Sequence, residues 1–190
     1  MIYNINGGDF MFNSIINTEN FIIRPFEIED IDNIYTSWGK DEKMFLDLSF
    51  KQPCSKSEMK SLVLNWIKEY ENDGYNACFS ILKDNHSIGF IRTKDYKEYC
   101  GGIVSIECGL SSEEWNKGIM SECLLAFAKH LLLKCGINRV EARCNADNKS
   151  INRVLEKCGM TLEGRIRESG CSNRSVKYDE NMYSLLRKDI

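Results

Sequence analysis

The segment from Glu113 to Glu122 (EEWNKGIMSE) most constrains the fold of this chain, because it joins a strand-like run to a helix-like one. Residues Ile103–Leu110 before it have strand composition, whereas Ile119–Leu133 after it repeats apolar residues at helical spacing. One glycine, Gly118, lies at the junction. Because the first turn of a helix has unpaired backbone N–H groups at the positive end of its dipole, this junction is predicted to attract phosphate.

The rest of the pattern predicts a single α/β domain over residues 18–190, preceded by an N-terminal extension over residues 1–17. Its sheet is expected to be mixed but mostly antiparallel, with about seven strands and helices on both faces. The other expected strands are Phe21–Arg24, Ala77–Leu82, Ile88–Arg92, Arg139–Asn145, Thr161–Arg167 and Tyr178–Leu186. The other expected helices are Glu27–Trp38, Ser55 to about Asp73, and Ile151–Lys157.

Charge and cysteine content exclude several classes of protein. The chain has 190 residues and a net charge of −3, from 25 basic and 28 acidic residues, so nucleic acid is not an expected partner. Its apolar runs are far shorter than the ~18 residues that a membrane span requires. The nine cysteines are odd in number and form no C-x-x-C pair. We therefore expect free thiols, a cytoplasmic location and no metal site.

Three segments in this order give the chain a resemblance to a known family. They are TENFIIRPFEIED (Thr18–Asp30), LSSEEWNKGIMSE (Leu110–Glu122) and NKSINRVLEKCGMTLEGRIRE (Asn148–Glu168). Together they resemble the GNAT superfamily of acyl-CoA-dependent N-acetyltransferases, and more narrowly the branch that includes the ribosomal-protein N-terminal acetyltransferases. The resemblance spans residues 18–190. It implies a GNAT-like fold, acetyl-CoA as cosubstrate and an amine as acceptor.

The resemblance also implies which residues hold the donor. Backbone N–H groups would surround the CoA pyrophosphate from Trp115, Asn116, Lys117, Gly118, Ile119 and Met120. The Lys117 ammonium would add charge there, or it is simply solvated beside an ordinary helix start. The strand residues Cys108, Gly109 and Leu110 would pair with pantetheine and polarise the thioester carbonyl. Gly109 suits a bulge at which the strands part. Asn148 would bind pantetheine or cap a helix, or do both, and Asn145 is a further candidate.

Catalysis requires a neutral amine and a group that accepts its proton. Glu107 is the candidate base because it lies in the strand beside the expected thioester, although it could equally be a strand residue paired with a lysine. Tyr183 is a candidate general acid, or a core or cleft-wall residue. The family often has a tyrosine where this chain has Leu155, and a serine where it has Ile151. The group that returns a proton to CoA is therefore left open.

We therefore expect an enzyme, monomeric or homodimeric, that acetylates a protein N-terminus or a small amine by direct attack. A mechanism in which acetyl is first transferred to the Cys108 thiol is less simple than direct attack, because no histidine lies nearby in the sequence to activate that thiol. The alternatives are a non-catalytic acyl-CoA-binding regulatory module and a phosphate-binding interaction domain unrelated to CoA. The acceptor pocket is expected to be walled by Gly39–Pro53, Asp95–Gly102 and Ser169–Ser175, which do not identify the amine.

Overall fold

The computed structural model describes residues 15–72, 75–172 and 175–190, in which eight strands form one sheet. The strand order is β1-β2-β3-β4-β5-β6-β8-β7, and every neighbouring pair is antiparallel except β5 and β6. The strands are β1 (Ile16–Asn17), β2 (Ile22–Pro25), β3 (Cys78–Lys83), β4 (His86–Lys97), β5 (Ile103–Leu110), β6 (Arg139–Asn145), β7 (Thr161–Cys171) and β8 (Lys177–Leu186).

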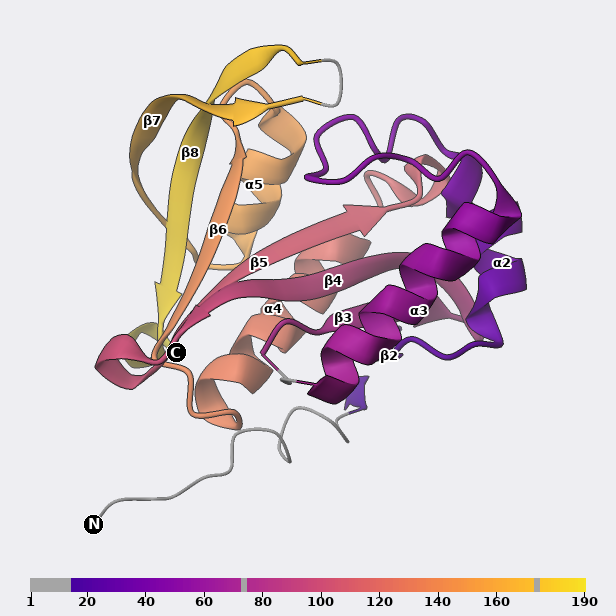
Figure 1. Ribbon diagram of the computed structural model, residues 1–190. Coiled ribbons are helices and arrows are strands. Elements are labelled where there is room, and N and C mark those ends of the chain that lie inside the picture. The colour runs from indigo at the N-terminus through magenta and orange to yellow at the C-terminus, as the bar shows by residue number, and fades with distance from the viewer. Residues whose placement is uncertain (1–14, 73–74, 173–174) are drawn as a thin grey trace.

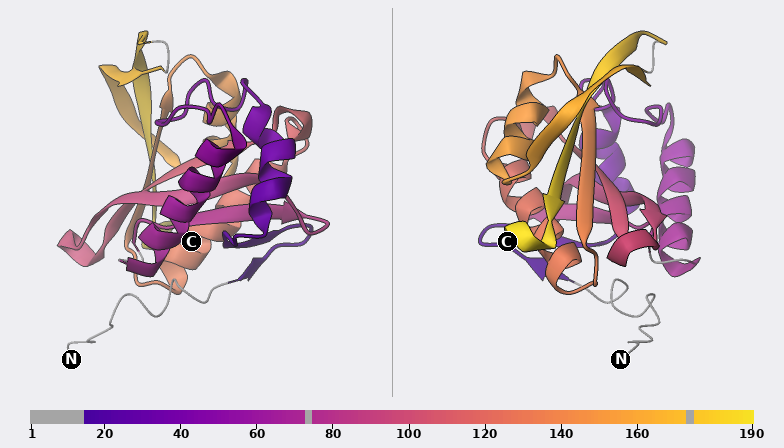
Figure 2. Two further views of the ribbon diagram at one scale, coloured as in Figure 1. Left: turned by 45° about the vertical axis from the view of Figure 1, so that its right-hand side comes forward. Right: turned by 90° about the vertical axis from the view of Figure 1, so that its left-hand side faces the viewer.

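Helices cover both faces of this sheet (Figure 1). One face carries α2 (Asp30–Thr36) and α3 (Lys56–Asn72), and the opposite face carries α4 (Ile119–Leu133) and α5 (Lys149–Lys157). Figure 2 shows these two layers from the side, with the β7–β8 hairpin projecting beyond them. In the described ranges, no helix is long and apolar enough to cross a membrane. All nine cysteines are free, as the sequence predicts.

The sequence predicts the elements well, and the sheet is larger than expected by one strand. β5, α4 and β6 have the predicted bounds, and the hairpin between β3 and β4 turns through Asp84 and Asn85, both with positive φ. The added strand is β1, which pairs with β2 through two residues only. Two residues are too few to show a strand periodicity, so the pattern could not reveal it.

Each face of the sheet has its own core. On the α4 side, Phe79, Phe127 and Leu131 belong to a cluster that runs across the central strands. On the α2–α3 side, aromatic residues dominate: Trp66 lies 5.6 Å from Phe90 and 5.0 Å from Phe26, ring centre to ring centre. The apolar stripes of α3 and α4 are therefore buried against opposite faces of the sheet, α3 over β3 and β4 and α4 across the central strands that include β5.

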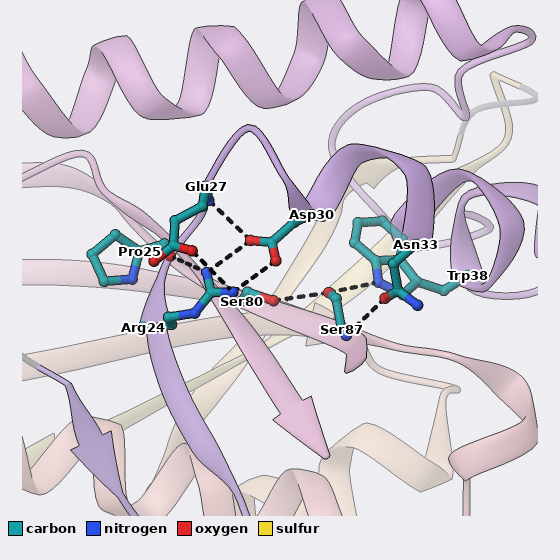
Figure 3. Close-up of polar contacts among 8 residues, drawn as sticks. All are labelled: Arg24, Pro25, Glu27, Asp30, Asn33, Trp38, Ser80 and Ser87. Carbon is teal, nitrogen blue, oxygen red and sulfur yellow. Dashed lines mark hydrogen bonds and ion pairs between the residues drawn. The ribbon is translucent and has the colours of Figure 1, made fainter. Parts of the chain in front are cut away.

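Polar contacts attach α2 to the sheet (Figure 3). The Arg24 guanidinium in β2 donates to both carboxylate oxygens of Asp30, at 2.8 and 2.7 Å, and Asp30 also accepts the Glu27 N–H at 2.9 Å. A second contact joins Trp38 to the β3–β4 hairpin, where its indole N–H donates to the Ser87 hydroxyl at 3.1 Å. These contacts satisfy charged and polar groups that packing has removed from water.

Replacing Asp30 with alanine should lower the free energy of unfolding by about 3 kcal/mol, because it leaves the largely buried Arg24 guanidinium with only the exposed Glu27 carboxylate, at 3.5 Å, as its anion. The side chains of Arg24 and Asp30 are only 16% and 9% exposed. Asp32→Ala is the matched control, since Asp32 is 77% exposed and pairs with the exposed Lys56. That change should stay within about 0.5 kcal/mol. Urea denaturation measures both, and equal losses would contradict the structural role of Asp30.

Candidate active site

The parallel pairing of β5 with β6 stops partway along both strands. Its last pair is Ile106 opposite Ala142, and the described residues form no later one. β5 continues beside β4 as far as Leu110, and β6 continues beside β8 as far as Asn145. Because each strand follows its other neighbour, the two separate, and their C-terminal ends point apart in Figure 1. We call this region the fork.

The fork opens without a bulge at Gly109, so that prediction is wrong. β4 and β5 keep one register along this stretch, and the irregularity between them lies farther away, at Lys94–Lys97. The glycine is required for a different reason: a Cβ atom there would lie 2.7 Å from both the Met44 methyl group and the Phe90 ring. The strands separate because β5 continues beside β4 and β6 continues beside β8, which needs no extra residue.

A cavity of about 1190 Å³ lies in the fork. All of the predicted site residues line it except Lys117 and Tyr183. The predicted residues that line the cavity are Glu107, Cys108, Gly109, Leu110, Trp115, Asn116, Gly118, Ile119, Met120, Asn145 and Asn148. The three predicted wall segments contribute as well, through Lys43, Met44, Asp47, Leu48 and Ser49, through Asp95 and Lys97, and through Ser169, Gly170 and Cys171. The part of the last segment at 173–174 lies outside the described residues.

Backbone groups of β5 face the fork. The Ser111 N–H donates to the Ile88 carbonyl of the neighbouring hairpin at 2.9 Å. Backbone N–H and C=O groups alternate in direction along a strand. Those of Cys108 and Leu110 therefore point the other way, toward the side where β6 is no longer paired with β5. The Trp115 indole N–H donates to the Leu110 carbonyl at 2.8 Å, in agreement with that direction. Past the last β5–β6 pair, the Leu110 carbonyl is therefore occupied by Trp115, and the backbone groups of Cys108 and the Leu110 N–H are the ones that face the open side.

The turn before α4 collects backbone donors at one end of the cavity. Asn116 and Gly118 both have left-handed conformations, with φ of 62° and 80°. Within the described chain, no acceptor is bonded to the N–H groups of residues 116–121, and the first paired N–H of the helix belongs to Glu122. We call these residues the N–H cradle. Such a run of outward donors at a helix start suits an anion.

Lys117 belongs to the same turn, but its ammonium points to a carboxylate. It donates to Glu114 at 3.1 Å, and Glu114 also contacts Lys83 at 3.2 Å. Its charge is therefore already paired, and its side chain does not line the cavity. The donors that the structure brings to this end of the cavity belong to the backbone.

Asn148 is the N-cap of α5 and also lines the cavity. The oxygen of its side-chain amide accepts the N–H groups of Ser150 and Ile151 at 3.2 and 3.3 Å. Its amide nitrogen donates to Asp47 at 2.8 Å, which joins α5 to the loop after α2. Asn145 forms a local turn, in which its side chain accepts the Asp147 N–H at 3.0 Å. Both asparagines present polar groups at the β6 side of the fork.

Glu107 lies in the cavity wall with both carboxylate oxygens engaged. Its carboxylate accepts from Arg92 at 2.6 Å and from the N–H and hydroxyl of Ser49 at 2.9 and 3.0 Å. Burial raises the pKa of the Glu107 carboxyl, but the charges of Arg92 and Lys94 and the hydrogen bonds from Ser49 lower it by more. Its pKa therefore lies below the ordinary value. The group is ionised at neutral pH.

Tyr183 lies away from the cavity, in the packing between β8 and α5. Its side chain is 1% exposed, and its hydroxyl donates to Asn152 at 2.9 Å. The side-chain amide of Asn152 in turn donates to the backbone carbonyl of Asn148 at 2.7 Å and to that of Asn145 at 3.1 Å. Tyr183 thus supports the loop that carries both asparagines, and the structure does not bring its hydroxyl to the fork.

The sequence did not single out the contacts that tie the loop after α2 across the fork. Asp41 accepts the Ser112 N–H, Ser49 binds Glu107 and Asp47 binds Asn148. The last two contacts join residues 58 and 101 positions apart. The apolar composition of Gly39–Pro53 indicated a cleft wall, but no local pattern indicates which polar side chains meet over such separations.

Comparison with known proteins agrees with this geometry. Residues 20–161 match the family described as the acetyltransferase (GNAT) domain. YoaA, an uncharacterized N-acetyltransferase of Bacillus subtilis, is 23% identical over 91% of this chain and 97% of its own length. The ribosomal-protein-serine acetyltransferase of Escherichia coli is 29% identical over 58% of this chain and 61% of its own length.

Solved structures show the same fold. RimL, a ribosomal-protein α-N acetyltransferase in complex with coenzyme A, matches with a TM-score of 0.80 at 23% identity, over 91% of this chain and 98% of that chain. The microcin self-immunity acetyltransferase MccE, in complex with acetyl-CoA and AMP, matches with a TM-score of 0.80 at 19% identity, over 90% and 94%. At these identities, the likeness concerns the architecture.

Glu107→Gln should make the protein less stable at neutral pH by about 1–3 kcal/mol, since it removes the charge that Arg92 binds. Because the folded-state pKa of Glu107 is depressed, its contribution is present above the ordinary value of 4.5 and is lost as the pH falls through the folded value. The stability difference between the native and variant proteins should therefore shrink below pH 4.5. Denaturation at pH 7 and at several lower pH values measures it, and a difference independent of pH would contradict the assignment.

Proposed function

Because the chain belongs to the GNAT acetyltransferase family, we propose that it transfers acetyl from acetyl-CoA to a primary amine by direct attack on the thioester. The family establishes that the protein is an acetyltransferase; the donor, the acceptor and the residues that act are the proposal. The observation that carries it is the fork, with outward backbone groups on β5 and the N–H cradle at one end. This arrangement suits a long ligand with an anionic group and an extended arm.

The cradle would bind the pyrophosphate through the N–H groups of residues 116–121, which have no other partner in the described chain. The pantetheine arm would then lie along β5, where the backbone groups of Cys108 and Leu110 face the fork. Asn148 lines the opposite side. For its amide nitrogen to bind the arm, the contact with Asp47 would have to exchange, whereas the N-cap bonds of its oxygen can remain.

The reaction forms one C–N bond and breaks one C–S bond. The neutral amine attacks the thioester carbon, negative charge develops on the carbonyl oxygen, and the thiolate leaves. A fork-facing N–H of β5 would stabilise that developing charge, as oxyanion-hole donors do. Transfer through Cys108 is disfavoured because burial raises the pKa of its thiol well above the ordinary value, which keeps it protonated.

Glu107 would receive the proton that the amine loses, directly or through water. Its carboxylate is ionised and lines the cavity, but its depressed pKa makes it a weak base toward an ammonium group. We therefore place its action after the attack, when bonding to the carbonyl carbon has acidified the nitrogen. Arg92 and Ser49 hold the carboxylate in place for this step.

The departing thiolate needs little help from the protein. The corresponding tyrosine position is Leu155, which is buried and lines the cavity without a proton to donate. A simple thiol has a pKa of about 8.5, so its thiolate is a good leaving group near neutral pH. We propose that solvent returns the proton to CoA.

A weak base favours acceptors whose amine is partly neutral beforehand. An α-amine with a pKa of about 7.8 is roughly one-third neutral at about pH 7.5, whereas a lysine ε-amine with a pKa of about 10.4 is neutral in only about one molecule in a thousand. The site therefore suits a protein N-terminus, or a small amine of similarly low pKa. The named relative that acetylates a ribosomal protein supports the first of these acceptors.

CoA release from acetyl-CoA should be accelerated by peptides with a free N-terminus or by a small low-pKa amine. It should be accelerated far less by N-blocked peptides that contain lysine. The measurement is a thiol assay over a panel of peptides, polyamines and small amines. Tight acetyl-CoA binding without turnover on any amine would instead indicate a non-catalytic acyl-CoA-binding module, and failure to bind CoA at all would indicate an unrelated phosphate-binding domain.

Glu107→Gln should lower kcat/KM by about a hundredfold, the usual contribution of a general base. Ser49→Ala is the companion variant: it removes one hydrogen bond to the carboxylate but keeps its charge, and it should cost far less activity. Both are assayed at a pH where each variant is folded. An unchanged rate for Glu107→Gln would remove Glu107 from the proposed role.

Gly118→Ala should weaken acetyl-CoA binding by disturbing the left-handed turn that orients the cradle. Gly136→Ala provides a close control, because Gly136 also has a positive φ, 74°, and no atom lies within 4 Å of the added Cβ at either position. Each change should cost about 1 kcal/mol of stability. Only Gly118→Ala should raise the Kd measured by titration calorimetry. Equal Kd values for the two variants would exclude the N–H cradle as a binding site for acetyl-CoA.

A further inference from the structure

One hydrogen bond crosses the open end of the fork and joins residues that lie 101 positions apart in the chain. The Asp47 carboxylate, in the loop after α2, accepts it from the Asn148 side-chain amide at 2.8 Å. Met44, Phe45 and Leu48 bury this loop in the core on the α2–α3 side, whereas Asn148 begins α5 on the opposite face of the sheet (Figure 1). The bond therefore connects the two layers that flank the sheet, and we call it the latch.

The latch can break while the loop stays in position. Asp47 is exposed, Asn148 is half-buried, and both line the cavity. The loop has another anchor on the sheet, because Ser49 donates to Glu107 through both its N–H and its hydroxyl. Asp47 forms no ion pair with a described residue. A new partner for its carboxylate would therefore displace no cation of the described chain.

The proposed donor and Asp47 require the same side-chain nitrogen. The oxygen of the Asn148 amide already accepts the N–H groups of Ser150 and Ile151 in the first turn of α5. Only the nitrogen is left to bind the pantetheine arm, and the latch holds that nitrogen toward the loop after α2. An arm bound along the fork would therefore compete with Asp47 for this group.

Once released from the latch, the Asp47 carboxylate would remain near the proposed base. Asp47 is two residues from Ser49, whose hydroxyl lies 3.0 Å from the Glu107 carboxylate. Burial raises the pKa of the Tyr178 hydroxyl, and the carboxylates of Glu180, Asp47 and Glu107 raise it further. Tyr178 also lines the cavity. Asp47 and Glu107 therefore act on one hydroxyl in the cavity wall, which places Asp47 on the same side of the fork as the base.

We propose that Asp47 exchanges partners during the reaction: it binds the Asn148 amide while the donor site is empty, and an N–H group of the acceptor once the donor has taken that amide. The latch lowers the affinity of the empty protein for acetyl-CoA, because the state that binds the donor requires an open latch. Donor binding then releases a carboxylate for the acceptor, so the two substrates bind with positive coupling. This inference rests on the proposed function, and it makes Asp47 a determinant of acceptor affinity.

Titration calorimetry with acetyl-CoA tests the latch. Asp47→Ala should lower the Kd by about fivefold, because the Asn148 amide no longer has a partner to leave. Asp47→Asn should give an intermediate Kd, since a neutral amide oxygen accepts a weaker hydrogen bond than a carboxylate does. Glu42→Ala is the matched control: Glu42 is exposed in the same loop and does not line the cavity, so this variant should bind acetyl-CoA as the native protein does.

Steady-state kinetics test the second partner of Asp47. The acceptor is the peptide with a free N-terminus that the native protein acetylates fastest, and acetyl-CoA is saturating. Asp47→Ala should raise the KM for this peptide by about tenfold, the usual effect of losing a hydrogen bond to a charged group, and change kcat far less. Glu42→Ala should change neither. A general disturbance of the loop would weaken the binding of both substrates, whereas the exchange predicts a tighter donor and a weaker acceptor in one variant.

An Asp47→Ala protein that binds acetyl-CoA no more tightly than the native protein would overturn the inference, and so would an unchanged KM for the acceptor. Both results leave the acetyltransferase proposal intact, because the native protein still binds the donor and turns it over. Absence of acetyl-CoA binding or of turnover in the native protein would overturn both.

Discussion

The parallel ladder between β5 and β6 ends at Ile106 and Ala142, and the site depends on that ending. Before it, the two strands are hydrogen-bonded neighbours; beyond it, each remains bonded only to the strand on its other side. Backbone groups that would otherwise complete a sheet are left facing a cavity. Parallel strands are normally buried and fully paired, so an interrupted pair in the middle of a sheet provides binding groups without an exposed edge.

The surrounding structure keeps the fork open. α4 packs on β5 from one face of the sheet and α2 and α3 pack on β3 and β4 from the other, while β4 pairs with β5 and β8 pairs with β6. The loop after α2 then crosses the open end, because Asp47 and Ser49 bind residues on opposite sides of it. Figure 1 shows this loop beside α5 and the end of β5. This loop and the β7–β8 hairpin both contribute polar residues to the lining of the cavity.

Charge is distributed unevenly in the cavity. Near β5, Arg92 and Ser49 hold the Glu107 carboxylate in place, and the Arg92 guanidinium balances its negative charge. Along α5, the cations that line the cavity form no ion pair with a described residue. The backbone donors of the N–H cradle lie between these two regions in the chain. The structure thus separates a carboxylate that already has a cationic partner from cations that have none among the described residues.

The sequence by itself determined the order of the elements, the bounds of β5, α4 and β6, the N–H cradle at Gly118 and the N-cap at Asn148, whereas β4 and β7 are longer and α2 is shorter than predicted. These follow from local rules: apolar periodicity, helix capping and the unpaired N–H groups of a first turn. Only the tertiary structure decided which residues face the fork. The sequence assigned Gly109 to a bulge, and the structure instead shows close packing by Met44 and Phe90. It placed Tyr183 under the Asn145–Asn148 loop and Glu107 beside Arg92, because contacts across many residues depend on strand register and loop path, which no local pattern contains.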